Sequence, residues 1–244
     1  MKSALLLALV FSSTAFGLTV KATTDKYQFK AEAIKSAFVH NSTGNVHIAP
    51  VVSKTAYVIV NKIKWGPRCS ANIDLVDGQL KVETDDTAWI LDHECRVDLI
   101  ISLPSQIPLQ IRAGTGDIKV IATRGDVDVK VGSGLIALKG EINNLKALSG
   151  SGDVRMEGRA QSADIKTGSG DIEMDYSTAP DKGRLALKTG SGDVQVFLPE
   201  STKVKSQIST GNGTVVNEFN AAENTERLDV DAASETGNIQ IRKK

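Results

Sequence analysis

The sequence predicts an all-β protein, a parallel β-solenoid with two short strands in each repeat of about 18 residues. Three observations lead to this prediction. A glycine-rich corner recurs through residues 101–244, apolar and polar residues alternate on both sides of each corner, and no part of that region shows a helical period. Repeats of this kind can stack as coils about 4.8 Å apart, and their apolar positions then form continuous columns.

The chain begins with a segment that has the features of a secretory signal peptide. Lys2 supplies a positive charge, residues 4–11 are apolar, and Ala15 and Gly17 are small residues before an expected cleavage point. The apolar run is shorter than the roughly 20 residues that cross a bilayer, and no second long apolar stretch follows. We therefore expect residues 1–17 to be removed. The protein is then exported, to the periplasm or to the cell surface or extracellular space, without a transmembrane segment.

The two cysteines of the chain, Cys69 and Cys95, predict one disulfide. An exported protein meets oxidising conditions, and an even pair of cysteines there most simply forms a bridge. A redox or metal pair is the alternative, since His93 is close by. The spacing is not C-x-x-C, however, and no histidine-rich cluster adjoins the cysteines. The bridge is the favoured interpretation, and chain entropy predicts about 3 kcal/mol of stabilisation from it.

The repeat is clearest around the second glycine of each Gly-Ser-Gly or related corner. These glycines are Gly116, Gly134, Gly152, Gly170, Gly192, Gly213 and Gly237. Two residues after each of them stands a β-branched apolar residue: Ile118, Ile136, Val154, Ile172, Val194, Val215 and Ile239. Five residues before each of them stands another apolar residue: Ile111, Val129, Ala147, Ile165, Leu187, Ile208 and Ala232. This alternation predicts two half-buried strands per repeat.

An antiparallel meander, with Gly-Ser-Gly-Asp as a hairpin turn, explains the same alternation. It explains less readily why every second strand resembles its predecessor, so the parallel solenoid is favoured. In this interpretation residues 106–244 form the regular repeats. Residues 18–105 form an irregular N-terminal part of the same domain, with the disulfide and with degraded copies of the pattern around Gly44 and Gly78. Solenoids need such atypical ends to cover their first apolar layer.

The recurring corners also carry a family resemblance. Gly-Ser-Gly-Asp followed by Val or Ile, and the segment 97–104 that leads into residues 114–118, resemble the bacterial DUF4097/DUF2807 group of adhesin-like proteins with β-strand repeats. The likeness covers roughly residues 37–244. It implies an exported, β-helix-like protein of the cell envelope, and it brings no catalytic residues to positions of this chain.

The composition weighs against nucleic-acid binding and against catalysis. Lys plus Arg and Asp plus Glu both number 29, so the formal net charge is zero, whereas a protein that binds a polyanion such as DNA needs an excess of clustered cations. Three histidines and two cysteines leave little material for metal or nucleophilic chemistry. We predict no enzyme activity, no cofactor and no metal, and the sequence assigns no ligand-binding residues.

An aspartate follows the glycine in four corners, and these aspartates would line up along one edge of the solenoid. They are Asp117, Asp153, Asp171 and Asp193. Calcium binding is one interpretation, but Leu135 and Thr214 interrupt the column, and a hard cation needs six or more oxygen ligands. The favoured interpretation is that these side chains satisfy turn backbone groups through local hydrogen bonds.

The function that the sequence favours is a non-catalytic cell-envelope protein, an adhesin-like binding or scaffolding platform for a surface ligand, either a protein or a glycan. The alternative is a glycan-cleaving β-helix enzyme, a lyase or hydrolase, which would need a paired acid and base in a groove. Outward charged residues fit an ordinary solvated strand face instead: Arg155, Glu157, Arg159 and Glu173. The cluster of Asp92, His93 and Glu94 fits a solvated loop beside Cys95.

Overall fold

The computed structural model describes residues 23–86, 95–178, 180–220 and 227–244, and within these ranges the fold is all-β, as predicted. Apart from the 3-10 turn η1 (Ala31–Ala33), every regular element there is a strand. No helix in the described part of the chain has the length and apolar character that a membrane crossing requires.

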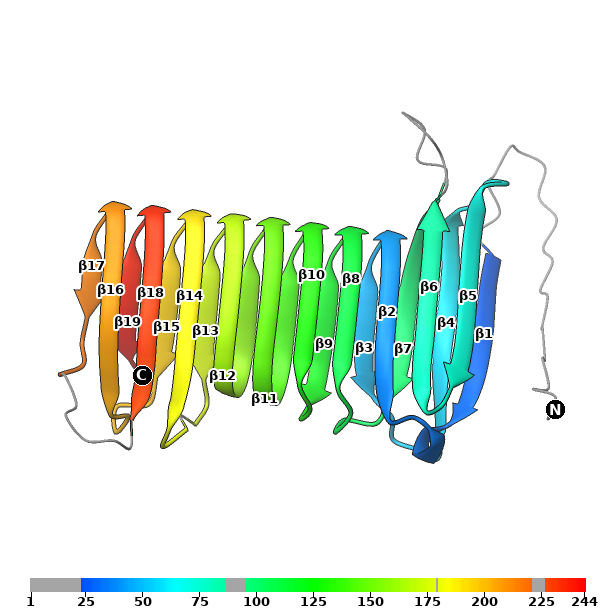
Figure 1. The fold of residues 1–244 in the computed structure, drawn as a ribbon, viewed down its shortest axis with the longest axis horizontal. Coiled ribbons are helices and arrows are strands. Elements are labelled where there is room, and N and C mark those ends of the chain that lie inside the picture. The colour runs from blue at the N-terminus through cyan, green and yellow to red at the C-terminus, as the bar shows by residue number, and fades with distance from the viewer. Residues whose placement is uncertain (1–22, 87–94, 179, 221–226) are drawn as a thin grey trace.

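The strands are drawn in Figure 1. Those of the N-terminal part are β1 (Thr23–Lys30), β2 (Ser36–Thr43), β3 (Val46–Pro50), β4 (Thr55–Lys64), β5 (Cys69–Val76), β6 (Gln79–Asp86) and β7 (Arg96–Leu103). The repeats follow with β8 (Leu109–Thr115), β9 (Ile118–Thr123), β10 (Val127–Ser133), β11 (Ile136–Ser151), β12 (Val154–Ser169) and β13 (Ile172–Tyr176). The last are β14 (Gly183–Ser191), β15 (Val194–Leu198), β16 (Val204–Asn212), β17 (Val215–Asn217), β18 (Leu228–Thr236) and β19 (Ile239–Lys243).

Successive repeats lie side by side and pair in parallel. Val127 of β10 pairs with Leu109 of β8 on one side and with Leu145 of β11 on the other, each one repeat of 18 residues away. Ile136, after the next corner, pairs in the same way with residues of β9 and β12. The pairing is that of stacked coils and not of an antiparallel meander. We call the strands before the corners the first layer and the strands after them the second layer (Figure 1).

The corners require glycine because neighbouring coils touch there through their backbones. Gly152 has a φ of +136°, and a Cβ on it would lie 2.2 Å from the carbonyl oxygen of Gly134 in the preceding coil. At Gly150, the first glycine of the same corner, a Cβ would lie 2.6 Å from the carbonyl oxygen of Gly132. Both glycines of the Gly-Ser-Gly corner are therefore fixed by the close stacking of the coils.

Two repeats depart from the prediction of two short strands. β11 and β12 each run for 16 residues without a break, from the second layer of one coil into the first layer of the next. Gly158, with a φ of +122°, lies in the middle of β12 and aligns with Gly140 of β11. A glycine at this bend lets the ladder of hydrogen bonds continue from one layer to the other.

The coils do not stack in chain order at either end. β18 pairs with β14 on one side and with β16 on the other, and β19 lies likewise between β15 and β17. The coil of β18 and β19 is thus inserted between the coil of β14 and β15 and the coil of β16 and β17. The coil of β16 and β17 forms the end of the stack (Figure 1, orange beyond red). At the other end, β2 lies between β6 and β8, and β3 between β7 and β9.

The N-terminal part mixes coils with antiparallel strands. Gly44, with a φ of +118°, makes a corner between β2 and β3. The copy of the repeat expected around Gly78 is wrong, because Asp77 and Gly78, both with positive φ, form the turn of the antiparallel hairpin β5–β6. Alternation is the same in a hairpin and in a coil, so the apolar spacing did not separate the two. β1 and β4 are also antiparallel to their neighbours, in the pairs β1–β4 and β4–β7.

The predicted disulfide is present. It joins Cys69 at the first position of β5 to Cys95 just before β7, with the two Cα atoms 5.6 Å apart. β5 pairs with β6 only, among the strands described. The bridge therefore attaches the end of the β5–β6 hairpin covalently to the strand that enters the second layer.

The apolar columns form the core between the two layers. Ile118, Ile136, Val154, Ile172, Val194 and Ile239 are all fully buried, as are most residues five positions before the corner glycines. The coil of β16 and β17 is the exception, since Val215 is 47% exposed. Its inward positions carry Ser206 and Asn217, which hydrogen-bond to one another at 2.9 Å. Polar residues at these positions suit a coil whose outer side has no further coil to cover it.

Candidate functional site

The aspartates after the corner glycines form a ladder between coils. One carboxylate oxygen of Asp153 accepts the backbone N–H of Asp171 at 3.0 Å, and Asp171 in turn accepts the N–H of Asp193 at 2.8 Å. Asp193 continues the ladder to the N–H of Asn238 at 2.7 Å, and the side-chain oxygen of Asn238 accepts the N–H of Thr214 at 3.0 Å. The hydrogen bonds run to the next coil, so the expected contact within the same turn is wrong in its detail.

The ladder has a second, shorter section on the other side of Leu135. Asp117 accepts the backbone N–H of Leu135 at 2.9 Å. Towards the N-terminal part, Asn45 accepts the backbone N–H of Asp117, and Asp98 accepts the backbone N–H of Asn45. Leucine has no acceptor, so the ladder stops there and resumes at Asp153. Among the described residues, no three His, Cys, Asp or Glu side chains gather as a metal site would require. The ladder is accounted for by backbone hydrogen bonding.

The outer side of the second layer carries ion pairs, both between neighbouring coils and within one coil. Lys139 and Glu157 pair at 2.5 Å, and Arg155 lies 3.1 Å from Asp153 and 3.7 Å from Glu173. All these side chains are at least one-third exposed, and Arg159 is exposed on the same strand as Arg155. The arrangement is a solvated surface of mixed charge, which is the favoured interpretation from the sequence. The cluster around His93 lies outside the described residues.

The outer side of the first layer carries a groove that the sequence did not predict. It has a volume of about 470 Å³ and crosses six neighbouring strands, near the start of β6, β2, β8 and β10 and near the middle of β11 and β12. The strands are β6, β2, β8, β10, β11 and β12, and their order follows from the pairings described above.

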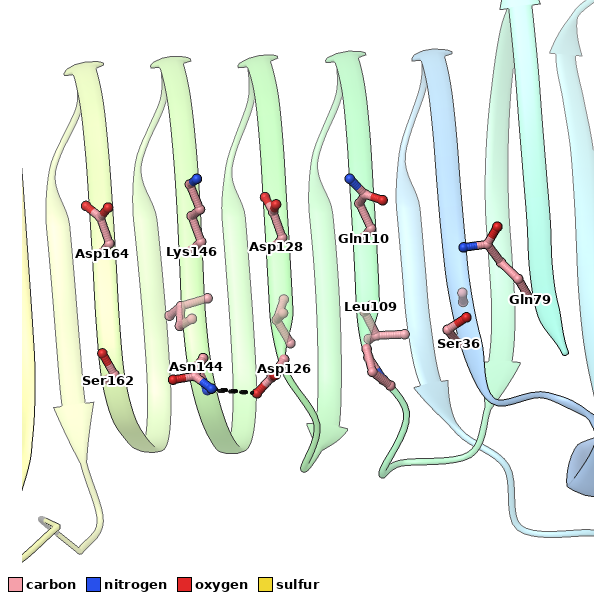
Figure 2. Close-up of a pocket in the computed structure, with 14 residues that line it drawn as sticks. Ser36, Gln79, Leu109, Gln110, Asp126, Asp128, Asn144, Lys146, Ser162 and Asp164 are labelled. Carbon is pink, nitrogen blue, oxygen red and sulfur yellow. Dashed lines mark hydrogen bonds between the residues drawn. The ribbon is translucent and has the colours of Figure 1, made fainter.

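Two rows of polar side chains bound the groove, as Figure 2 shows. The upper row is formed by residues that are aligned by strand register: Gln110, Asp128, Lys146 and Asp164. The lower row contains Ser36, Asp126, Asn144 and Ser162. Between the rows lie Leu109, Val127 and Leu145, whose side chains are buried in the core. Strand backbone therefore forms the floor between the two rows.

Part of the groove wall is fixed by internal contacts. The guanidinium of Arg112 donates two hydrogen bonds to the carboxylate of Asp128, both at 3.0 Å. The backbone N–H and the side-chain amide of Asn144 donate to one oxygen of Asp126 at 3.2 and 3.0 Å. Lys166 lies 3.6 Å from Asp164. These contacts hold the three carboxylates of the groove in place.

Other polar groups of the groove are left without a partner. Within the described ranges, the side chains of Ser36, Gln79, Gln110, Lys146 and Ser162 make no hydrogen bond or ion pair. Each is at least partly exposed. Sequence reasoning had no signal for this groove, because its residues come from six strands and resemble ordinary solvated positions in each of them.

Comparison with other proteins agrees with this architecture. No curated protein matches the sequence of the chain. A solved structure from Bacteroides fragilis, described as a candidate adhesin, covers 93% of this chain and 100% of its own, with a TM-score of 0.56 and 15% identity. Another candidate adhesin, from Parabacteroides merdae, covers 91% of this chain and 97% of its own, with a TM-score of 0.52 and 12% identity. At such low identity, these likenesses show a shared fold alone.

The repeat region itself identifies the family. The sequence profile described as Toastrack DUF4097 matches residues 108–242, from the first strand of the regular repeats to the last. This match spans more than half of the chain and includes the seven glycine corners from Gly116 to Gly237. The protein belongs to the Toastrack DUF4097 family.

Proposed function

We propose that the protein is an exported, non-catalytic β-solenoid whose outer surface binds a ligand of the cell envelope or cell surface, in the manner of an adhesin. The observation that carries this proposal is the groove of the first layer, with its aligned rows and its unpartnered polar side chains. The disulfide supports export, because such bridges persist in oxidising compartments. The description of the Bacteroides fragilis structure as a candidate adhesin agrees with the same function.

The coil architecture suits a binding surface. Each strand of the central coils is held by neighbours on both sides, so side chains on the outer face keep a fixed spacing of about 4.8 Å. A ligand with a repeating structure can then make the same weak contact several times. The binding free energies of these contacts add, because the first contact already holds the ligand beside the other sites.

Two carboxylates of the corner ladder that a glycan-cleaving mechanism could use are already engaged in structural hydrogen bonds. Asp153 and Asp171 each accept a backbone N–H from the next coil, and Arg155 lies beside Asp153. A general acid must release and regain a proton on such a carboxyl group. A carboxylate that accepts a structural hydrogen bond is poorly suited to that role, which supports a binding protein over a hydrolase or lyase.

The experiment incubates the purified protein with bacterial cells, cell-wall fragments and a panel of polysaccharides, with and without calcium. Retention on the particles and release of soluble products are both measured. We expect retention without products. Release of products that stops in the variants Asp153→Asn and Asp171→Asn would overturn the non-catalytic part of the proposal, and a protein that is retained by no cell or wall preparation would overturn the binding part.

The asparagine variants are suitable because the chain itself already uses asparagine in this ladder. Asn45 and Asn238 occupy the equivalent corner position and accept the same backbone hydrogen bond through the side-chain oxygen. Asp153→Asn and Asp171→Asn therefore keep the hydrogen bond of the corner while they remove the carboxyl group that could give up or accept a proton. Loss of a catalytic activity in them would not be a consequence of unfolding.

A further inference from the structure

We propose that the groove of the first layer binds an uncharged linear polysaccharide that lies along the stack of coils, across the strands. This inference rests on the proposed binding function and adds the class of ligand and the residues that contact it. It is carried by three features of the groove: its length, the free hydrogen-bonding groups along its walls, and its charge balance.

The groove has the length and direction that an extended polymer requires. It crosses six strands from Gln79 of β6 to Asp164 of β12. Five strand spacings of about 4.8 Å give a length of roughly 24 Å. The floor is flat because residues 109, 127 and 145 turn their side chains into the core. A chain of sugar rings can lie on such a floor, with its hydroxyl groups directed at the two polar rows.

The free groups along the walls match a ligand rich in hydroxyl groups. Gln110 and Lys146 stand in the upper row, and Ser36 and Ser162 stand in the lower row, each without a partner among the described residues (Figure 2). The two hydroxyls and the amide can both donate and accept hydrogen bonds, and the ammonium group donates. The engaged carboxylates of Asp126 and Asp128 retain further acceptor capacity, because a carboxylate oxygen accepts more than one hydrogen bond.

The charges of the groove balance. Its three carboxylates are Asp126, Asp128 and Asp164. The cations that face them are Lys146 in the upper row, Arg112 on Asp128 and Lys166 on Asp164. A strongly anionic polymer would meet carboxylates on β10 and β12, and a strongly cationic polymer would meet Lys146 on β11. An uncharged polymer avoids that repulsion, and this is the reason for assigning an uncharged ligand.

A peptide that binds through its backbone does not fit this place. Such peptides add a strand to an open sheet edge and use the unpaired N–H and C=O groups there. The groove lies in the middle of a layer, where β10 is paired with β8 on one side and with β11 on the other. Recognition must therefore come from side chains, and these are the hydroxyl, amide and charged groups already described.

The test measures binding of oligosaccharides to the purified full-length protein by calorimetry and by NMR. The probes are uncharged linear hexamers of glucose, mannose, galactose and N-acetylglucosamine. A galacturonate hexamer, a glucosamine hexamer and a polar dodecapeptide without net charge serve as comparators. We expect at least one uncharged hexamer to bind more tightly than all three comparators. We also expect its amide shifts to concentrate on β8, β10 and β11.

The variant that tests the site is the double substitution Gln110→Ala with Lys146→Ala. Both side chains are exposed and make no internal contact in the described structure, so the fold should persist. Loss of two hydrogen bonds should weaken binding at least about tenfold. The matched control removes the same residue types from the second layer, with Lys119→Ala on β9 and Gln195→Ala on β15, and it should bind like the unaltered protein.

Three results would overturn the inference. These are binding of no uncharged hexamer, tighter binding of a charged hexamer or of the peptide, and unchanged affinity in the groove variant. The cell-retention experiment described above stays independent of them. If the unaltered protein and the groove variant are retained equally by cells, the groove is not the site while the binding function stands. If neither is retained, the binding function itself fails.

Discussion

The side-chain hydroxyl of Thr167 donates a hydrogen bond to the carbonyl oxygen of Gly152 in the preceding coil, at 3.1 Å. The same bond recurs from Thr189 to Gly170 and from Ser234 to Gly192, both at 3.0 Å. These hydroxyls lie inside the corners, where they are almost completely buried. The small or β-branched residue three positions before each corner glycine thus joins one coil to the next.

Thr167→Val should lower the stability of the protein, because the Gly152 carbonyl loses its buried donor. The expected loss in the free energy of unfolding is about 1–3 kcal/mol, measured by urea denaturation. Ser149→Ala is the matched control, since the Ser149 hydroxyl is buried and finds no partner in the described structure. That control should leave the stability nearly unchanged. Equal losses in the two variants would contradict the role of the hydroxyl bond.

The carboxylate ladder makes a second prediction. Asp171→Ala removes the acceptor of the Asp193 N–H and should lower the free energy of unfolding by about 1 kcal/mol. Asp171→Asn keeps an acceptor in the same place and should cost less. Chemical denaturation of both variants compares them directly. Equal losses in the two variants would mean that the charge, and not the hydrogen bond, stabilises the corner.

Gly152→Ala should be strongly destabilising. The added Cβ would lie 2.2 Å from the Gly134 carbonyl oxygen, at a φ of +136°. Backbone strain of this kind alone costs about 1–3 kcal/mol, and the close contact adds to it. Thermal denaturation monitored by circular dichroism measures the loss. Ser151→Ala, at an exposed residue of the same corner, is the control and should melt with the unaltered protein.

The disulfide predicts a difference between reduced and oxidised protein. Mass spectrometry without reductant should find Cys69 and Cys95 joined in a single peptide pair. Reduction should lower the free energy of unfolding by about 3 kcal/mol, a magnitude typical of a loop of 26 residues. Freshly purified protein with two free thiols would contradict this prediction.

The phenol of Tyr176 predicts a loss of stability at high pH. Burial raises its pKa well above the ordinary value, and the hydroxyl donates to the carbonyl oxygen of Ala160 at 2.9 Å. The unfolded chain therefore releases this proton more readily than the native protein. The stabilisation is complete below pH about 10 and declines as the pH rises above that value.

An ultraviolet titration tests this directly, because the chain contains three tyrosines. One of them should ionise only when the protein unfolds. Tyr176→Phe should be less stable at neutral pH, by about 1 kcal/mol for the lost hydrogen bond. The difference in the free energy of unfolding between the two proteins should shrink above pH about 10. There the unaltered protein loses stability, because its unfolded state releases the phenol proton and its native state does not. A constant deficit at all pH values would show that Tyr176 titrates normally.

Much of the fold follows from local pattern. The apolar columns, including Ile118 and Ile165, were predicted from alternation around the glycines, and these residues are fully buried. Alternation depends only on which side of a strand faces the core, so it did not distinguish the hairpin at Gly78 from a coil. The dipeptide Asp77-Gly78 is common in hairpin turns, and this dipeptide was the feature of the sequence that could have indicated the hairpin.

The order of the coils and the groove were beyond the reach of this pattern. The spatial order depends on which coils have apolar inward side chains and can be covered by a further coil on each side. The coil of β16 and β17 instead has the polar residues Ser206 and Asn217 at inward positions. Those polar positions were visible in the sequence as gaps in the columns. The groove depends on the alignment of side chains from six strands, such as Asp126 and Asn144, which meet only after the register is known.

The insertion of the last coil has a consequence for biosynthesis. β16 and β17 emerge from the ribosome before β18 and β19, yet the strands they pair with are these later ones. The coil that closes the stack must therefore wait without a partner until β18 and β19 have been made. A growing chain can assemble its central coils one after another, but that end of the stack forms only after β18 and β19 have been made. A chain cut before β18 therefore leaves the coil of β16 and β17 without the strands that it pairs with.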